Sequence, residues 1–347
     1  MASKKKVRIG KYVIGGNEPV RVQSMLNTPA YDIEAACRQA SELENAGCEI
    51  IRATVPDMSA VRTVAKLKEC CTVPIVADIH FDYKMALESI AAGVDKIRIN
   101  PGNIGGDDKV KAVADACKAK NIPIRIGVNS GSVEKHILEK YGSPTPEALA
   151  ESALYHVSLL NKFDFDDIVI SLKSSDVRKT VEAYRLMSKR CDYPLHIGVT
   201  EAGTMRMGLI KSAAGLGSLL LDGIGDTLRV SLTAPPVNEV YAGYDILKAV
   251  GLRSSGVNLV TCPTCGRTKI DLIGLAEKVE NALRGCQKNI TVAVMGCAVN
   301  GPGEAREADI GIAGGSGDGL IFKKGQIIGK VPEEKLFETL MNEIEKM

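Results

Sequence analysis

The chain has 347 residues, of which 45% are hydrophobic and 25% are charged, and its formal net charge at pH 7 is +2. This length and balance predict a globular protein with one large α/β domain and a smaller second domain. The near-neutral charge argues against a nucleic-acid partner held by bulk charge, and no stretch reaches the apolar length of a membrane span.

The first residues, MASKKKVRIGKYVIGG, are basic, but no continuous apolar segment follows them, so we do not expect a signal peptide. Ten cysteines in a chain without an export signal indicate a reducing, cytoplasmic location, where thiols stay free or bind metal. Cysteines inside helical or strand-like patterns, such as Cys37, Cys48 and Cys117, are interpreted as small buried hydrophobic residues.

A unit of apolar strand, polar turn and amphipathic helix recurs from residue 19 to about residue 250. Strands are predicted at 19–25, 49–55, 74–80, 95–100, 123–129, 167–173, 195–200 and 227–233. The helices between them include 32–47, 85–93 and 237–251. This alternation predicts a parallel sheet, and eight such units fit a (β/α)₈ TIM-type barrel. A doubly wound open sheet is the alternative, but no GxGxxG follows the first strand.

After Gly251 the pattern changes. Residues 253–258 read as a linker, and a smaller α+β region follows with a helix at 271–285 and a strand at 289–296. A strand at 309–315, a hairpin at 319–331 and a last helix at 332–347 complete it. The predicted domains are therefore a barrel over residues 1–252 and an α+β domain over residues 253–347.

Polar side chains share one face of each predicted barrel strand. In the strand 95–100, Arg98 and Asn100 alternate with Ile97 and Ile99. The apolar face must meet the helices, so the polar face should line the barrel mouth, where TIM barrels carry their active sites. The residues with this pattern are Arg52, Thr54, Asp78, His80, Arg98, Asn100, Arg125, Asn129, Ser171, Lys173, Arg229 and Ser231, with Thr200 and Glu201 after the seventh strand.

Five of these residues are cations: Arg52, Arg98, Arg125, Lys173 and Arg229. Burying several like charges without counter-ions is costly, so the pattern predicts a ligand with several negative charges. Arginine forks suit phosphate oxygens. The alternative is that each arginine pairs with an acid or turns outward at its strand end. His80, beside Asp78, is a candidate for orientation or proton transfer.

Three cysteines lie on two loops of the second domain. Cys262 and Cys265 form a CxxC on a turn, and Cys297 lies in the glycine-rich stretch MGCAVNGPGEA at 295–305. A CxxC is open to zinc, redox and iron–sulfur interpretations. The loop residues GRTK after Cys265 disfavour a thioredoxin-like role. Glycine and asparagine around Cys297 leave backbone N–H groups for cluster sulfurs, which favours iron–sulfur over the zinc alternative.

The fourth ligand has two candidates. Cys286 ends a predicted helix in ALRGCQKN, where a helix-end or core role is favoured. Glu304 lies on the same loop as Cys297. A carboxylate holds iron less firmly than a thiolate does, so a Glu304 ligand would be displaceable by a substrate oxygen.

The motifs TCPTCGRT, MGCAVNGPGEA, VADIHF, KIRINPGN, RIGVNSGS, SLKSSD and HIGVTEAG closely resemble the 4-hydroxy-3-methylbut-2-enyl diphosphate synthases of the non-mevalonate isoprenoid pathway. The resemblance covers nearly the whole chain, in the bacterial two-domain form. It implies a [4Fe–4S] cluster held by Cys262, Cys265, Cys297 and Glu304. An iron–sulfur oxidoreductase is thus expected, with Glu304 acting as both ligand and catalytic residue.

The resemblance also implies the reaction. The substrate would be 2-C-methyl-D-erythritol 2,4-cyclodiphosphate, opened and dehydroxylated to (E)-4-hydroxy-3-methylbut-2-enyl diphosphate with single electrons from reduced flavodoxin or ferredoxin. Among the family's pocket positions, Glu201 is the first candidate for proton delivery to the departing hydroxyl and His80 the second. The remaining positions, expected to bind substrate, are Arg52, Asp78, Arg98, Asn100, Arg125, Asn129, Lys173, Thr200, Arg229 and Ser231.

The linker predicts a head-to-tail homodimer. Barrel helices run antiparallel to the strands, so the last one ends at the face opposite the active site. Residues 253–257, at about 3.3–3.6 Å per residue, span less than roughly 20 Å. Because this is too short to bring the second domain over its own barrel mouth, we expect each second domain to cap the partner's barrel.

Two other functions fit parts of the sequence. One is a barrel enzyme acting on a phosphorylated sugar or carboxylate, with a purely structural zinc domain. The other is a non-catalytic iron–sulfur carrier or sensor. The inward cations argue against a simple carrier, which needs no anion pocket.

Overall fold

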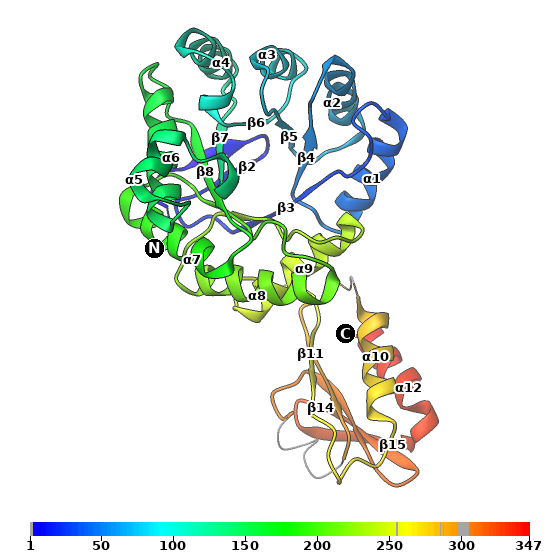
Figure 1. The fold of residues 1–347 in the computed structure, drawn as a ribbon. Helices are drawn as coiled ribbons and strands as arrows, with labels where there is room; N and C mark the ends of the chain where they lie inside the picture. The colour runs from blue at the N-terminus through cyan, green and yellow to red at the C-terminus, as the bar shows by residue number, and fades with distance from the viewer. Residues whose placement is uncertain (1–2, 255, 285, 287, 298–304) are drawn as a thin grey trace. The chain divides into compact units, whose positions relative to one another are not determined.

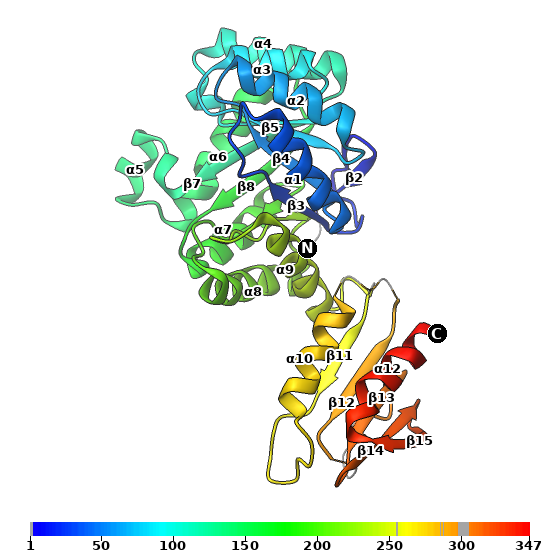
Figure 2. The same ribbon diagram turned by 90° about the vertical axis from the view of Figure 1, so that its right-hand side faces the viewer.

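The computed structural model describes residues 3–254, 256–284, 286, 288–297 and 305–347. The chain divides into two compact units, residues 1–252 and residues 253–347. Figures 1 and 2 show both units from two directions. Within the described residues, no helix is both long and apolar enough to cross a bilayer.

The first unit is the predicted barrel, with helices surrounding the strands (Figure 1). Its strands are β3 (Arg21–Met25), β4 (Ile50–Thr54), β5 (Ile75–Asp78), β6 (Lys96–Ile99), β7 (Ile124–Asn129), β8 (Ile168–Lys173), β9 (His196–Ile197) and β10 (Thr227–Leu228). Its helices are α1 (Ile33–Asn45), α2 (Met58–Cys70), α3 (Tyr83–Ala91), α4 (Asp107–Lys120), α5 (Lys135–Tyr141), α6 (Pro146–Asn161), α7 (Val177–Arg190), α8 (Met205–Leu221) and α9 (Pro236–Ala249).

The eight strands follow one another around the barrel in chain order. Their hydrogen-bonded order is β8-β7-β6-β5-β4-β3-β10-β9, and all of these pairs are parallel. A parallel bridge between Ile170 and Leu195 joins β8 to β9 and closes the ring. The TIM-type barrel is therefore confirmed, and the doubly wound open sheet is excluded because that sheet does not close.

The strand register arranges the inward side chains in layers. Following the pairings once around the barrel returns to β3 eight residues away, which is the shear of 8 of TIM barrels. At this shear, alternate strands contribute four side chains to each layer. From the N-terminal end upward, layer 1 holds Ile50, Lys96, Val169 and Thr227; layer 2 Gln23, Val76, Arg125 and His196; layer 3 Arg52, Arg98, Ser171 and Arg229; and layer 4 Met25, Asp78, Gly127 and Gly198. The strands themselves reach layer 5 at Thr54 and Lys173, and Asn100 follows directly after β6.

An antiparallel hairpin precedes the barrel, formed by β1 (Val7–Ile9) and β2 (Tyr12–Ile14). Its buried residues Val7, Ile9 and Ile14 pack against Ile50, Val76 and Val169 of layers 1 and 2. The hairpin therefore covers the N-terminal end of the barrel with apolar surface. We did not predict it, because three-residue strands are too short to show an alternating pattern.

The seventh and eighth barrel strands are much shorter than predicted. Residues 195–200 pair only over His196–Ile197, and residues 227–233 pair only over Thr227–Leu228. One further ladder bond joins the Arg229 N–H to the Ile197 carbonyl, at 3.0 Å. Beyond it the chain leaves the ladder, so Thr200, Glu201 and Ser231 lie on loops rather than on strands.

The second unit is an α+β domain around a five-stranded mixed sheet. The strands, in spatial order, are β11 (Asn258–Thr261), β12 (Thr291–Met295), β13 (Ile310–Gly314), β14 (Asp318–Lys323) and β15 (Gln326–Pro332). The first three run parallel and the last two pairings are antiparallel. Helices α10 (Leu272–Leu283) and α12 (Leu336–Glu345) share one core with the sheet and lie along it in Figure 2. The strand β11 was not predicted.

Candidate active site

Two arginines of layer 3 share one carboxylate above them. Arg98 Nη1 lies 3.1 Å from Asp78 Oδ1, and Arg52 Nε lies 3.5 Å from Asp78 Oδ2. Only 3% of Asp78 is exposed. Burial alone raises the pKa of Asp78, but the neighbouring Arg52 and Arg98 outweigh it and hold this pKa well below its usual value. Asp78 is therefore ionised at neutral pH and fixes both guanidinium groups.

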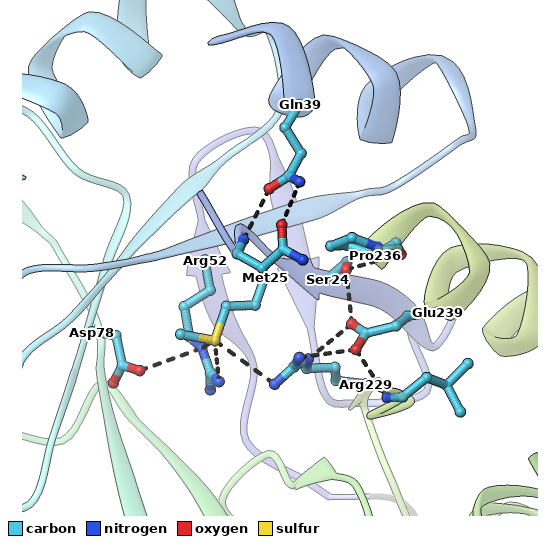
Figure 3. A network of polar contacts seen from close by, with 10 residues as sticks. Ser24, Met25, Gln39, Arg52, Asp78, Arg229, Pro236 and Glu239 are labelled. Atoms are coloured by element: carbon cyan, nitrogen blue, oxygen red, sulfur yellow. Dashed lines mark hydrogen bonds and ion pairs between the residues drawn. The ribbon is translucent and has the colours of Figure 1, made fainter. Parts of the chain in front are cut away.

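The third arginine of layer 3 is held by a carboxylate from helix α9. Glu239 accepts from Arg229 Nε at 3.1 Å and from Nη2 at 3.0 Å, a bidentate pair (Figure 3). The same carboxylate accepts from Ser24 Oγ at 3.0 Å and from the Leu232 N–H at 3.1 Å. Four hydrogen bonds therefore satisfy Glu239, which sequence reasoning missed. The sequence signal that could have identified Glu239 was an acidic residue on the otherwise apolar, buried face of α9.

A thioether lies between two of these cations. Met25 Sδ accepts from Arg52 Nε at 3.1 Å and Nη2 at 2.7 Å, and from Arg229 Nη1 at 3.7 Å (Figure 3). Sulfur is a weak acceptor, so it orients the guanidinium groups without neutralising them. Met25 was not among the predicted site residues.

Both glycines of layer 4 lie where a side chain would collide, and Gly127 makes room for a long cationic side chain. A Cβ on Gly127 would lie 2.3 Å from Arg98 Nε, and Arg98 Nη2 donates to the Gly127 carbonyl at 3.2 Å. A Cβ on Gly198 would instead lie 2.9 Å from the Arg229 carbonyl oxygen, whereas Lys173 Nζ at 3.5 Å would be in ordinary van der Waals contact. Lys173 itself is buried, and desolvation together with the charges of Arg52 and Arg125 places its pKa well below the usual lysine value.

The barrel interior carries a large excess of positive charge. The described inward positions of layers 1 to 5 hold six basic residues: Lys96, Arg125, Arg52, Arg98, Arg229 and Lys173. Facing them are one carboxylate of layer 4, Asp78, and one from α9, Glu239. The alternative that each arginine pairs with its own acid therefore fails for this part of the chain. Such an interior suits a ligand with several negative charges.

Arg125 occupies a different depth from the one expected. It belongs to layer 2, below the three arginines of layer 3, and none of its surface is exposed. The alternation of side chains along the strand predicted that Arg125 points into the barrel. It did not predict the position of Arg125 along the barrel axis, because that position depends on the register between β6 and β7.

The remaining predicted residues lie at or near the mouth. Asn100 is buried, accepts from the Gly102 N–H at 3.3 Å and leaves its Nδ2 without a partner among the described residues. His80 Nε2 lies 4.0 Å from Asp78 Oδ2, and its side chain is 49% exposed. Glu201 is exposed and has a φ of 51°, in the left-handed region that glutamate rarely adopts. Such strain is typical of functional positions. Asn129, Thr200 and Ser231 are only partly buried.

Replacing Asp78 with asparagine is expected to lower the free energy of unfolding by about 3–5 kcal/mol at pH 7, because two buried arginines lose their shared charge partner. The pKa of Asp78 is lower in the folded protein than in the unfolded chain. Wild type therefore keeps this contribution at pH values above the unfolded-state pKa and loses it as the pH falls through the folded-state pKa. The loss measured by urea unfolding should therefore be the same at pH 7 and pH 5.

The matched control is Asp115→Asn, whose carboxylate is 52% exposed in a surface pair with Lys111. This variant should change the unfolding free energy by no more than about 0.5 kcal/mol. Equal effects of the two substitutions would contradict the role assigned to Asp78.

In the second unit, the cysteine loops follow two neighbouring parallel strands. Cys262 comes directly after β11 and Cys297 comes two residues after β12, so both lie at the same edge of the sheet. The loops are joined by two hydrogen bonds. The Gly296 N–H donates to Cys262 Sγ at 3.2 Å, and the Lys269 N–H donates to the Gly296 carbonyl at 3.0 Å.

Cys265 is the third thiol of these loops. Hydrogen bonds from Arg267 lower the pKa of Cys265, which favours the thiolate form that binds metals. Among the described residues, no three His, Cys, Asp or Glu side chains are assembled into a metal-binding group. Glu304, the predicted fourth ligand, lies outside the described residues.

Cys286 lies at the other end of the same strand. It precedes β12, whereas Cys297 follows it. The five residues of β12 span about 16 Å at 3.3 Å per residue. This separation disfavours Cys286 as a ligand beside Cys297.

The fold and the two sites define a TIM-barrel protein with a cationic interior, joined to an α+β domain that carries three cysteines on adjacent loops. Residues 4–244 match the model of the GcpE TIM-barrel domain, and residues 258–346 match the model of the GcpE protein C-terminal domain. The chain belongs to the GcpE family.

Curated relatives match over essentially the whole chain. A protein of Geobacter sulfurreducens is 57% identical over 346 residues, covering 100% of this chain and 98% of the relative. A protein of Clostridium perfringens is 58% identical over 341 residues, covering 98% of both. Each is named 4-hydroxy-3-methylbut-2-en-1-yl diphosphate synthase (flavodoxin). The resemblance recognised from the motifs is thereby confirmed.

Solved structures of low identity share the barrel. The dihydropteroate synthase of Yersinia pestis aligns with a TM-score of 0.52 at 14% identity, covering 71% of this chain and 99% of that one. A truncated 3-deoxy-D-arabino-heptulosonate 7-phosphate synthase of Thermotoga maritima aligns with a TM-score of 0.52 at 12% identity, covering 72% and 97%. These likenesses concern the fold alone.

Proposed function

We propose that this protein is an iron–sulfur oxidoreductase of isoprenoid biosynthesis. It converts 2-C-methyl-D-erythritol 2,4-cyclodiphosphate to (E)-4-hydroxy-3-methylbut-2-enyl diphosphate by reductive ring opening and loss of a hydroxyl group. The full-length identity to curated synthases of this name supports the reaction. The observation that carries it is the excess of buried cations over carboxylates in the barrel, which suits a cyclic diphosphate.

The barrel binds and orients the diphosphate. Arg52, Arg98 and Arg229 are held by Asp78 and Glu239, so their remaining N–H groups are preorganised for phosphate oxygens. Lys173 adds a charge from layer 5, and Arg125 is proposed to add one from layer 2. The polar atoms of Asn100, Asn129, Thr200 and Ser231 surround the mouth and are proposed to hydrogen-bond the substrate.

The thiols of Cys262, Cys265 and Cys297, with the Glu304 carboxylate, are proposed to hold a [4Fe–4S] cluster. The described residues fit this group by their donor chemistry, since two hydrogen-bonded loops carry the thiols and the Gly296 N–H already donates to a cysteine sulfur. When bound, the cluster supplies single electrons, which protein side chains alone cannot deliver at low potential.

Glu201 is the proposed proton donor for the departing hydroxyl. Its exposed position at the mouth and its left-handed backbone support this role. His80 is the second candidate because its half-exposed imidazole lies at the mouth, with Nε2 4.0 Å from Asp78 Oδ2.

Reduced flavodoxin or ferredoxin is the proposed electron donor, and the printed names of the relatives support flavodoxin. The cluster needs reduced thiols, which is consistent with a cytoplasmic location. We also propose the head-to-tail homodimer, in which the cluster of one subunit serves the barrel of its partner. Its support is the short connection between α9, which ends at Ala249, and β11, which begins at Asn258.

Anaerobic turnover of the cyclodiphosphate with a one-electron reductant tests this function. Wild type should form the linear diphosphate and contain iron and acid-labile sulfide, whereas Glu304→Ala should lose about 100-fold or more in kcat, the scale of losses at metal-site residues. Zinc without sulfide would instead indicate a structural metal domain. A cluster without turnover or cyclodiphosphate binding would indicate a carrier.

A further inference from the structure

One buried histidine of the barrel domain lies outside the set of residues proposed to contact the substrate. His156 is on α6, and none of its surface is exposed. Its Nε2 lies 2.5 Å from Oε1 of Glu134, which directly precedes α5. A buried imidazole that is paired with a carboxylate is fixed in place, and such a buried polar pair requires a physical explanation.

The hydrogen bond between the two residues determines how the ring is oriented. Partial burial acts to raise the pKa of Glu134, but the hydrogen bond from His156 outweighs it and holds this pKa below its usual value. An ionised carboxylate only accepts, so Nε2 of His156 carries the donated proton. The other ring nitrogen, Nδ1, is buried without a partner among the described residues. Glu134 is therefore the hydrogen-bond partner that fixes the ring.

The opposite edge of the imidazole contacts the turn that follows β6. This turn is the 3₁₀ helix η1 (Pro101–Asn103). A Cβ on Gly102 would lie 2.8 Å from His156 Cε1 and 3.5 Å from its Nδ1. Real Cβ atoms essentially never approach other atoms to within 3.0 Å, and the φ of Gly102 is not in the left-handed region. Glycine is therefore required here by the close approach of the turn to the ring, not by its backbone conformation.

The same turn fixes the side chain of Asn100. The Gly102 N–H donates to Asn100 Oδ1 at 3.3 Å, and the Asn103 N–H donates to the Asn100 carbonyl at 2.9 Å. Because Oδ1 is already an acceptor for Gly102, the amide presents its Nδ2, which is buried without a partner among the described residues. An N–H donor suits a phosphate oxygen, whereas the flipped amide would present an acceptor. The orientation of Asn100 thus depends on the position of the Gly102 N–H.

We propose that His156 is a positioning residue for the substrate site, acting through Gly102 on the side-chain amide of Asn100. Glu134 fixes the imidazole, the imidazole fixes the turn, and the turn presents Asn100 Nδ2 to the substrate. This inference rests on the proposed function, in which Asn100 hydrogen-bonds the cyclodiphosphate. Since Glu134 lies between β7 and α5, the pair also connects the loop after β7 to the turn after β6.

Calorimetric binding of the cyclodiphosphate to the full-length protein, under anaerobic conditions and without reductant, tests the inference. His156→Leu removes the donor to Glu134 and should raise the Kd about tenfold, the scale of one hydrogen bond to a charged group. In an Asn100→Ala background the same substitution should change the Kd by less than about twofold, because the group through which it acts is gone. His156→Gln, whose amide can still donate to Glu134, should restore most of the affinity. The control His136→Leu, at an exposed histidine of α5, should bind like wild type.

An unchanged Kd for His156→Leu would overturn the inference. Equal weakening in both backgrounds would also overturn it, because the effect would not pass through Asn100, and the proposed function would be unaffected. If Asn100→Ala binds as tightly as wild type, the substrate contact of Asn100 fails together with the inference. Absent turnover with the expected binding results would contradict the proposed reaction alone.

A second variant decides if His156→Leu does not fold. Gly102→Ala leaves the pair of His156 and Glu134 in place, but its Cβ must move the turn away from the ring. It should raise the Kd about tenfold in the wild-type background and by less than about twofold in the Asn100→Ala background. An unchanged Kd for Gly102→Ala would then overturn the inference.

Discussion

Gly127→Ala is expected to reduce kcat/KM for the cyclodiphosphate by about 100-fold, the scale of loss that a misplacement of roughly 1 Å produces. The new Cβ would lie 2.3 Å from Arg98 Nε and 2.9 Å from Arg98 Cζ. Arg98 must therefore leave the position in which Asp78 and the Gly127 carbonyl hold it. Because the obstructing atoms belong to a side chain, the barrel should still fold, and the loss should appear in steady-state kinetics rather than in expression.

The chain offers a close control in Gly131, just after the same strand. A Cβ at Gly131 meets nothing within 4 Å, and its φ is not in the left-handed region. Gly131→Ala should therefore keep kcat/KM within about twofold of wild type, as for a substitution without steric conflict. Full activity of Gly127→Ala would show that the Arg98 position is not needed for catalysis.

The inward direction of the pocket residues was predictable from the sequence because strand side chains alternate. Their positions along the barrel axis were not predictable. Arg125 and Asn129 lie on the same strand face, yet Arg125 is completely buried in layer 2 and Asn129 is only partly buried at the rim. The position along the barrel axis depends on the shear of the closed barrel, which arises from pairings between strands far apart in the sequence.

Two of the residues that orient the cations, Glu239 and Met25, were missed for a related reason. Glu239 lies on a helix and contacts Arg229 across one βα unit, while Met25 is an apolar residue at the end of a strand. An acidic residue on the buried face of α9 marks Glu239 as unusual but does not identify its partner, and Met25 leaves no local pattern, since each contact depends on tertiary packing of two elements. The same holds for the hairpin β1–β2, whose partners Ile50, Val76 and Val169 come from three different strands.

The cysteine loops were recognised from their composition, but their proximity follows from the strand β11, which the sequence did not reveal. Its exposed, four-residue pattern resembles a linker. Once β11 pairs in parallel with β12, Cys262 and Cys297 must emerge at the same edge of the sheet. Cys286 is separated from Cys262 and Cys297 because it precedes β12 and therefore lies toward the opposite end of that strand.

Cys297→Ser is therefore expected to lose most of its iron and acid-labile sulfide and to reduce turnover by more than about 100-fold, a loss that even second-shell changes at metal sites can reach. Serine keeps the size of the side chain but lacks the soft thiolate that iron–sulfur clusters require. The barrel is a separate compact unit. Binding of inorganic pyrophosphate, measured by calorimetry, should therefore stay within about twofold of wild type.

Cys286→Ser is the matched control, because it makes the same chemical change at the opposite end of β12. It should retain wild-type iron, sulfide and turnover. If Cys286→Ser loses its iron as completely as Cys297→Ser, the fourth ligand is a cysteine and the assignment of Glu304 is wrong. If instead Cys297→Ser keeps a full complement of iron and sulfide, the cluster is not held at the edge of the sheet where β11 and β12 end.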